Sequence, residues 1–439
     1  MEYLPAWMFL ALTILLLLGF PVAFTLLGTS LLFGLIGFGW DFFNLLPLRI
    51  WGIMTNFTLV AVPLFIFMGV MLERSRLAKD LLEAMSLLFG QRQGGLAISV
   101  VVVGGLLGAS TGIVGATVVT MGLLALPTMI RHGYQHELAT GTIVASGTLG
   151  QIIPPSIVLV LLGDIIGISV GDLFIGALLP GLLLLSLYMA YVWAVSFFKP
   201  GLAPPLPFEE IRKDFSNDSK WTYILKALFP PLLLMIAVLG SIFAGIASPT
   251  EAAGVGAFGA LVLAIANGRF NIHILKETML TTTHLTSMVF TILVGATAFG
   301  LVFRGLGGDM LVRDFVAHIP FGRWGILVTV MAIIFVLGFF LDFIEITFIH
   351  IPVLAPIMKS MGFDPVWFAI LFALNLQTSF LTPPFGFALF YLKGVSPPGV
   401  RTEEIYKGVA PFVLLQLLAL TLVALFPALA TWLPATMGR

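Results

Sequence analysis

Hydroxyl and amide side chains surround two Pro-Pro pairs that lie inside long apolar stretches of the chain. The pairs are Pro154-Pro155 and Pro383-Pro384. Because proline has no N–H, each pair must interrupt a helix and leave main-chain carbonyls without an intrahelical partner. Carbonyl, hydroxyl and amide oxygens suit a hard cation such as Na⁺, whereas a transition metal would ask for His or Cys ligands. The residues therefore predict cation binding at two broken helices.

A carboxylate adds a second kind of chemistry. Asp342 interrupts an apolar stretch, and a charged group at membrane depth is costly and usually functional. The structural alternative is a salt bridge with Arg304 or Arg323. Glu251 follows Ser248-Pro249-Thr250 and opens an Ala/Gly-rich helix, where a carboxylate can cap free N–H groups as readily as it can bind a ligand.

The segment Gly108–Gly112 also matches the G-x-S-x-G pattern of serine hydrolases, which makes Ser110 a candidate nucleophile of an intramembrane enzyme. Such an enzyme needs a histidine at matching depth, and only His350 is arguable. This alternative leaves a second copy of the same segment pattern unexplained. The sequence has no P-loop, so energy is expected from an ion gradient and not from ATP. We therefore expect no enzymatic activity.

The helix-breaking pattern occurs twice along the chain at one constant offset. Pro127, Met129, Gly133, Pro154 and Pro155 recur as Pro356, Met358, Gly362, Pro383 and Pro384. Paired interruptions in two halves of a membrane protein are the best sequence indication of a transporter's binding site.

Each copy also has a segment too long for one membrane crossing. Residues 95–130 and 324–360 are interrupted halfway, at 108–112 and at 341–345. We expect two re-entrant hairpins whose polar tips lie beside a cavity, because irregular backbone at membrane depth must be covered by protein or water. Each tip should face a broken helix, the first within 137–168 and the second within 365–393.

Composition agrees with a polytopic helical membrane protein. Hydrophobic residues make up 59% of the 439 residues, charged residues 10%, and mean hydropathy is +1.10. Net charge is zero, so we expect no nucleic-acid partner, and the absence of Cys excludes thiolate sites. The first apolar stretch, 5–38, is expected to be one retained span and not a signal peptide.

The segments rich in lysine and arginine are expected to lie on the cytoplasmic side of the membrane. With that assignment the first hairpin enters from the cytoplasm and the second from the opposite side, so the repeats are predicted to be inverted. The expected fold is an all-α polytopic membrane protein of the elevator type. Its predicted parts are N-terminal scaffold spans and a first arm helix (1–94), a first transport repeat (95–198), a cytoplasmic linker (199–221), scaffold spans and a second arm helix (222–323), a second transport repeat (324–395) and a C-terminal span (396–439).

Several motifs in this order resemble the DctM-type large membrane subunit of the tripartite ATP-independent periplasmic (TRAP) transporters. They include Gly19–Phe24, Pro63-Leu64-Phe65, Ser146–Ser156, Ala247–Ala253 and Thr382–Gly386. The resemblance runs essentially from end to end. It implies an elevator-type secondary transporter of the ion-transporter superfamily in the bacterial inner membrane, importing organic acids such as C4-dicarboxylates or sialic acid with Na⁺ and without an organic cofactor.

The same resemblance implies partners and ligands. A periplasmic binding protein would deliver the substrate, and a separate small membrane subunit is implied because this chain lacks the extra N-terminal spans of fused relatives. One sodium site would use Ser110, Thr111, Gly112, Gly150 and Ser156. The other would use Asp342, Gln377, Thr378 and Thr382. Residues expected near these sites, in substrate-binding or structural roles, are Thr148, Pro154, Pro155, Asn375, Pro383, Pro384, Gly386 and Glu251.

Two other kinds of transport protein are alternatives. A self-sufficient Na⁺/dicarboxylate symporter of the same superfamily would need no binding protein. An ion channel would need a continuous pore in place of two occluded hairpins. The whole set of motifs favours the TRAP interpretation.

Overall fold

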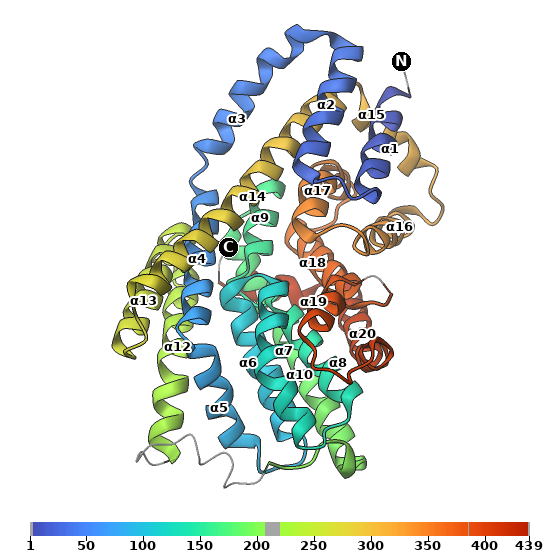
Figure 1. Ribbon diagram of the computed structural model, residues 1–439. Helices are drawn as coiled ribbons and strands as arrows, with labels where there is room; N and C mark the ends of the chain where they lie inside the picture. Colours follow the sequence, from blue (N-terminus) through green and yellow to red (C-terminus); the bar gives the residue numbers. More distant parts are fainter. Residues whose placement is uncertain (1–2, 207–219, 385, 438–439) are drawn as a thin grey trace.

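A computed structural model describes residues 3–206, 220–384 and 386–437, and it is helical throughout these ranges (Figure 1). Seven helices in the described ranges are long and apolar enough to cross a membrane, or up to eight if a bent pair near residues 40–74 counts as one span. The prediction of an all-α polytopic membrane protein is thereby confirmed. Most of the predicted linker 199–221 falls on 207–219, outside the described residues.

The helices outside the two repeats form a tall, slanted frame (Figure 1). They are α1 (Leu4–Leu17), α2 (Val22–Phe38), α3 (Leu46–Met54), α4 (Ala61–Arg74), α5 (Leu77–Phe89), α12 (Lys220–Phe243), α13 (Pro249–Ala266), α14 (Ile272–Gly305) and α15 (Gly308–Ala317). Among them α14 packs on α2 and α4, and α4 also packs on α13. Helices α5 and α15 lie near the ends of 1–94 and 222–323, the parts predicted to contain the two arm helices.

The expected single span 5–38 was wrong. The chain instead forms α1 and α2, which pack against each other. Between them Gly19 adopts a φ of +84°, which favours glycine, and Pro21 precedes the first turn of α2. The Leu-rich sequence on both sides conceals this turn, because both helices are apolar all round.

Each repeat contains a hairpin, a broken helix and a long closing helix. The first consists of α6 (Gly95–Thr111), α7 (Val114–Arg131), α8 (His136–Thr148), α9 (Ile157–Ile166) and α10 (Val170–Phe198). The second consists of α16 (Gly322–Leu337), α17 (Phe343–Ser360), α18 (Pro365–Leu381), α19 (Phe387–Val395) and α20 (Thr402–Leu425). Helix α20 falls in 396–439, which was predicted as a separate C-terminal span, and it is the counterpart of α10 in the first repeat. Figure 1 shows the first hairpin in the lower half of the molecule and the second in the upper half, as inverted repeats require.

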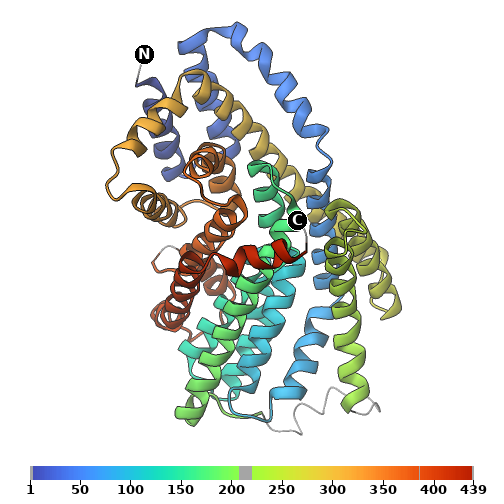
Figure 2. The ribbon, with the colours of Figure 1, turned by 180° about the vertical axis from the view of Figure 1, so that it is seen from behind.

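The closing helices cross over between the repeats. Helix α20 of the second repeat packs along α8 of the first, and α10 of the first packs on α18 of the second. A final helix, α21 (Ala428–Thr436), lies across α10 and α18 at the back of the molecule (Figure 2). This exchange makes the two repeats one packed unit.

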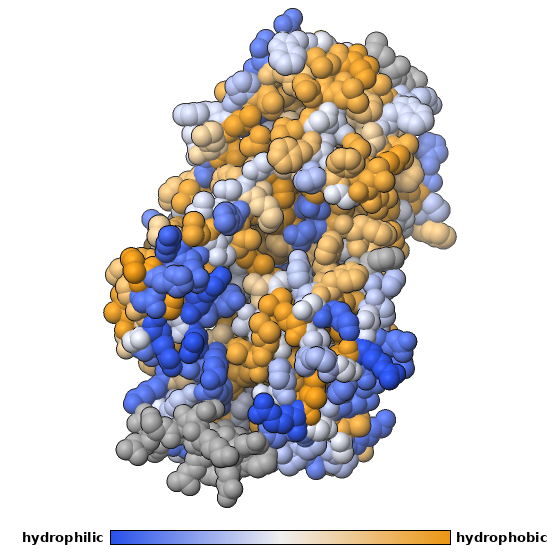
Figure 3. All heavy atoms as spheres, viewed as in Figure 1, coloured by the Kyte–Doolittle hydropathy of each residue, from blue (hydrophilic) through white to orange (hydrophobic). Residues whose placement is uncertain are grey.

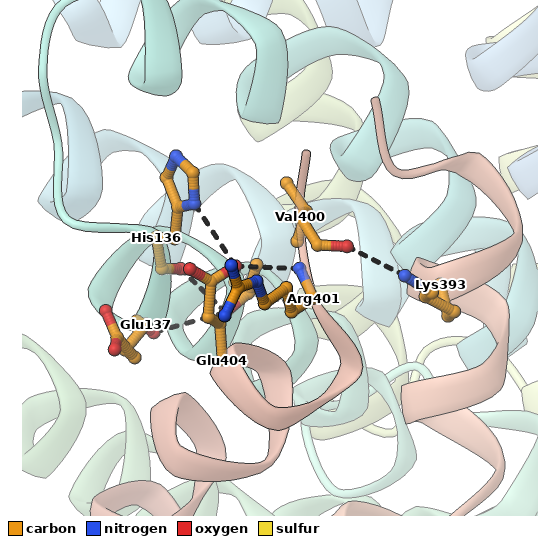
Figure 4. Close-up of polar contacts among 7 residues, drawn as sticks. His136, Glu137, Lys393, Val400, Arg401 and Glu404 are labelled. Atoms are coloured by element: carbon orange, nitrogen blue, oxygen red, sulfur yellow. Dashed lines mark hydrogen bonds and ion pairs between the residues drawn. The ribbon is translucent and has the colours of Figure 1, made fainter. Parts of the chain in front are cut away.

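A backbone contact and a side-chain hydrogen bond fix α20 to the start of α8, and Figure 4 shows the hydrogen bond. A side chain on Gly141 would collide with the Gly408 carbonyl, so these two helices touch through their backbones. Next to this contact His136 Nδ1 lies 3.2 Å from Glu404 Oε2, which also accepts a hydrogen bond from the Arg401 N–H at 2.7 Å. The pairing holds the lower end of the unit together.

The surface agrees with a position in lipid. Hydrophobic residues dominate the upper part of the face in Figure 3, while hydrophilic residues gather toward the lower end. Large apolar side chains such as Phe24, Phe258 and Ile236 are mostly exposed. Lipid tails can cover such surface at no cost, whereas water cannot.

Candidate ion and substrate site

The first hairpin tip is a tight turn between α6 and α7. Helix α6 ends at Thr111, and Gly112 takes a left-handed conformation with φ +62°. The Ser110 hydroxyl donates to the Leu107 carbonyl at 2.9 Å, and the hydroxyls of Thr111 and Thr117 lie 2.9 Å apart. The tip is therefore uncharged, buried and rich in oxygen atoms.

The first broken helix meets this hairpin at close range. After α8 the chain forms a short 3-10 turn, Leu149–Gln151, passes through Pro154 and Pro155, and resumes at Ile157. A side chain on Gly150 would collide with the Gly108 carbonyl, and one on Gly112 would meet Ile157. The Ser156 hydroxyl donates to the Gln151 carbonyl at 2.9 Å. The structure thus brings the residues predicted for the first sodium site to one hairpin–helix contact.

The second tip is built around carboxylates. Asp342 is the N-cap of α17, since its Oδ1 accepts from the Phe343 N–H at 2.7 Å while its own N–H donates to Glu345 Oε2 at 3.0 Å. The two arginines considered as partners are engaged elsewhere in the described chain. Arg304 donates to the Pro352 carbonyl at 3.1 Å, and the Arg323 guanidinium lies over the rings of Trp324 and Phe363. The salt-bridge alternative for Asp342 was therefore wrong.

The second broken helix faces its hairpin in the same way. Its hydroxyls donate along the helix, Thr378 to the Leu374 carbonyl and Thr382 to the Thr378 carbonyl, both at 2.7 Å. Their oxygen lone pairs are left to accept hydrogen bonds or to bind a cation.

Neighbouring residues position this second break. Asn375 donates to the Met331 carbonyl of α16 at 2.8 Å, which ties the broken helix to its hairpin. Tyr406 of α20 donates to the Pro384 carbonyl at 3.0 Å, where the chain passes through Pro383 toward Gly386. A side chain on Gly386 would collide with the Phe380 carbonyl, so the backbone turns back tightly here.

Two predicted residues lie differently. Gln377 donates from Nε2 to the Thr148 hydroxyl of the first repeat at 3.4 Å. Glu251 forms a capping box with Ser248 on the surface of α13, where its Oε2 accepts from the Ser248 N–H at 2.8 Å. Helix α13 packs chiefly on α4 and α12.

The hydrolase alternative needs Ser110 bound to a histidine, and the described residues provide none. The Ser110 hydroxyl donates to its own helix, while His350 Nδ1 lies 3.2 Å from the Ile346 carbonyl and its ring packs edge-on against Phe9. Neither group activates the other in this arrangement.

Comparison with known proteins agrees with this architecture. Residues 9–429 match the family described as "Tripartite ATP-independent periplasmic transporter, DctM component". The chain belongs to the DctM family. It is thus a large permease of a TRAP transporter and not an enzyme.

Curated DctM relatives cover nearly the whole chain. The C4-dicarboxylate TRAP transporter large permease protein DctM of Pseudomonas aeruginosa is 30% identical over 94% of each chain. The ectoine permease TeaC of Halomonas elongata is 30% identical over 95% of this chain and 96% of that one. The sialic acid permease SiaM of Vibrio cholerae is 30% identical over 96% of each chain.

A solved structure shares the fold of this DctM chain. The Alcanivorax borkumensis YdaH transporter superposes with a TM-score of 0.60 at 16% identity, covering 98% of both chains. At that identity the likeness concerns the fold alone.

A cavity of about 780 Å³ opens in the upper half of this DctM protein, between α3, α9, α14 and α17. Its charged lining residues are Arg49, Asp164, Arg304 and Lys359. Asp164 accepts a hydrogen bond from the Asn56 side chain at 2.6 Å, so its charge is partly engaged. The cationic side chains of Arg49, Arg304 and Lys359 favour the binding of an anion.

Tyr391 is a site residue that sequence reasoning missed. Its ring lies against Gly115 of the first hairpin, where an added side chain would approach it to about 2.9 Å, and it is close enough to Asp342 and Glu345 to interact electrostatically. An aromatic residue in α19 therefore lies between the two tips. Its position seven residues after Pro384 was the available signal, but Tyr391 resembles any other aromatic residue in an apolar helix.

Proposed function

We propose that this large permease imports organic acids with Na⁺, in the bacterial inner membrane, as a C4-dicarboxylate, sialic acid or similar transporter. The observation that carries the proposal is the pair of repeat-related contacts between a hairpin tip and a broken helix. Each presents oxygen atoms, from the buried Ser110 and Ser156 in one repeat and from the half-buried Asp342 and Thr382 in the other. Oxygen-only sets with at most one or two carboxylates suit Na⁺.

An anionic substrate makes coupling to Na⁺ necessary. Moving one charge against an inside-negative potential costs about 2.3 kcal/mol per 100 mV, so a dianion costs roughly 4.6 kcal/mol. Two Na⁺ ions entering with the dianion would cancel that charge. A third would let the potential drive uptake.

The basic cavity supports an entry route for the anion. Arg49 lies on α3 of the frame, while Lys359 lies on α17 of the second hairpin, and both line the same cavity. An organic acid released at the periplasmic surface would gain favourable interactions with these side chains before reaching the tips.

Motion of the repeats against the frame would supply alternating access by an elevator mechanism. The two repeats form one packed unit through α10 and α20, and polar bonds such as Thr120 to Glu73 at 2.7 Å and Asn56 to Asp164 at 2.6 Å join the frame to that unit. A small membrane subunit and a periplasmic binding protein would complete the transporter.

The test is uptake of labelled succinate and sialic acid into proteoliposomes that contain this chain and its small subunit. Binding protein and a Na⁺ gradient are each supplied or omitted. Uptake that requires both supports the proposal. Uptake without binding protein would favour the self-sufficient symporter, and uptake indifferent to Na⁺ would refute the coupling.

A further inference from the structure

Four polar side chains from four helices meet inside the packed unit. Gln377 of α18 and Gln416 of α20 each place Nε2 at 3.4 Å from the Thr148 hydroxyl of α8. The Thr148 hydroxyl donates its own proton to the Ala145 carbonyl at 2.9 Å. Tyr188 of α10 directs its hydroxyl at the same group. We refer to Thr148, Tyr188, Gln377 and Gln416 as the axis cluster.

The axis cluster lies where the two repeats are related by pseudo-symmetry. Thr148 and Gln377 are separated by 229 positions, the same spacing that relates Pro154 to Pro383. Tyr188 and Gln416 belong to α10 and α20, the closing helices of the two repeats. Each repeat therefore contributes one residue from its broken helix and one from its closing helix. The four residues meet at the pseudo-two-fold axis.

The axis cluster is buried and has unsatisfied oxygens. Thr148, Tyr188 and Gln377 have no exposed surface, and Gln416 is 1% exposed. Oε1 of Gln377 and Oε1 of Gln416 make no hydrogen bond within the described chain. Each buried group left in this way keeps the cost of having lost its water without gaining a partner. A bound species that accepts no hydrogen bond but attracts oxygen would remove that cost.

We propose that the axis cluster binds a monovalent cation, Na⁺ or K⁺, at a site separate from both hairpin tips. Rotating each terminal amide by a half turn would bring both Oε1 atoms to about the present Nε2 positions, 3.4 Å from the Thr148 oxygen. That spacing is long for an N–H···O bond. It matches two ligands at right angles around Na⁺ with metal–oxygen distances of about 2.4 Å, as for the similarly sized Ca²⁺, or at a narrower angle around the larger K⁺.

Charge and position favour a monovalent ion here. The four ligand side chains are neutral, so they cannot offset a divalent charge inside the membrane. Thr148 is the last residue of α8, where the free carbonyls of a helix end carry partial negative charge. This site takes Gln377 away from the second sodium site, to which the family resemblance had assigned it.

The inference deepens the proposed function, because an ion at the axis would add a third cation to the two at the tips and would join the repeats. The experiment uses the full chain with Ser110→Ala and Asp342→Asn, which weaken cation binding at both tips. Its thermal unfolding midpoint is measured while NaCl or KCl replaces choline chloride at constant ionic strength. We expect a saturating rise of the midpoint with one of the two cations, which identifies the ion.

Variants of the axis cluster test whether the cation-dependent rise of the midpoint comes from this cluster. Gln416→Leu should abolish the cation-dependent rise, whereas Gln416→Glu should make it saturate at a several-fold lower concentration. Ser196→Ala removes another buried hydroxyl of α10, which bonds only the Val192 carbonyl at 2.7 Å, and should leave the rise unchanged. If Gln416→Leu does not fold, Tyr188→Phe takes its place.

The proposal is overturned if no cation-dependent rise remains in the protein with weakened tips, or if Gln416→Leu leaves that rise intact, as expected for a water-filled cluster or for cations bound at the tips alone. Failure here would not affect the uptake test above. Conversely, Na⁺-independent uptake with an intact rise would refute coupling while leaving a structural cation at the axis.

Discussion

The two hairpin tips reach similar geometry with different chemistry. In the first, Gly112 makes the turn and the hydroxyls of Ser110 and Thr111 supply oxygen atoms without charge. In the second, Asp342 and Glu345 form a capping box at the start of α17. The two repeats thus share a backbone path but carry different side chains at the hairpin tip.

The contacts behind the tips differ in the same way. Gly108 and Gly150 touch through their backbones, whereas in the second repeat Gly338 lies against the Ser379 side chain. Gly150 and Ser379 occupy equivalent positions along the repeats. The first repeat therefore tolerates no side chain at a position where the second already has one.

Substitution at this contact should have the largest effect. Gly150→Val would drive a side chain into the Gly108 carbonyl and cost at least about 1–3 kcal/mol, with loss of transport. Ser379→Ala only removes a hydroxyl that donates to the Leu376 carbonyl at 2.7 Å, so we expect a change of roughly 1 kcal/mol or less. Thermal unfolding in detergent measures both. Equal effects would mean that the repeats pack alike.

Removing charge at the second tip should come next. Asp342→Asn should raise the Na⁺ concentration for half-maximal uptake roughly 10–100-fold, as loss of a metal-site partner does elsewhere. Ser110→Ala should raise it only a few-fold, because main-chain carbonyls remain at the uncharged tip.

Glu251→Gln is the matched control for that comparison. It changes a carboxylate on α13 to an amide that can still accept the capping hydrogen bond. Uptake and its Na⁺ dependence should stay as in the unmodified chain. A large change would show that α13 takes part in ion binding.

The ties between hairpins and frame should have a smaller and unequal effect. Thr120→Val leaves the half-buried carboxylate of Glu73 without its 2.7 Å partner and should cost about 1–3 kcal/mol. Arg304→Gln affects the exposed tie to the Pro352 carbonyl and should cost about 1 kcal/mol or less. Unfolding midpoints of the two variants test this order, and a reversed order would contradict it.

The weakest effect is expected in the basic cavity, which borders only the second hairpin. Arg49→Gln combined with Lys359→Gln should raise the KM for succinate a few-fold at low salt, and less at high salt, because screening reduces steering. Arg92→Gln changes a residue just before the first hairpin that does not line this cavity, and it should leave the KM unchanged. A salt-independent effect would argue against steering by charge.

Much of this fold could be predicted because its signals are local. Proline pairs, apolar length and the repeat spacing predict the hairpins and broken helices directly from residue types. The turn at Gly19 was missed because the flanking helices are uniformly apolar. The end of α20 at Leu425, before Pro427, likewise falls within a continuous hydrophobic stretch that predicts one longer span.

The polar core of the packed unit could not be predicted in the same way. Thr148 and Gln377 are far apart in sequence, and their contact depends on how two inverted halves dock. Tyr188 and Gln416 lie in helices whose sequences are typical of lipid-facing or core spans. A single glutamine inside an apolar span was the available signal, since polar groups at that depth are rarely idle.

Helix α14 has a consequence for the surrounding bilayer. Its 34 residues span about 50 Å at 1.5 Å per residue, while the hydrocarbon layer is about 30 Å thick. It must therefore lean, as its oblique path in Figure 1 shows, and it contacts α2, α4 and α17 along its length. Longer or shorter acyl chains would change the tilt of α14, so the thickness of the host membrane would affect the conformation of the transporter.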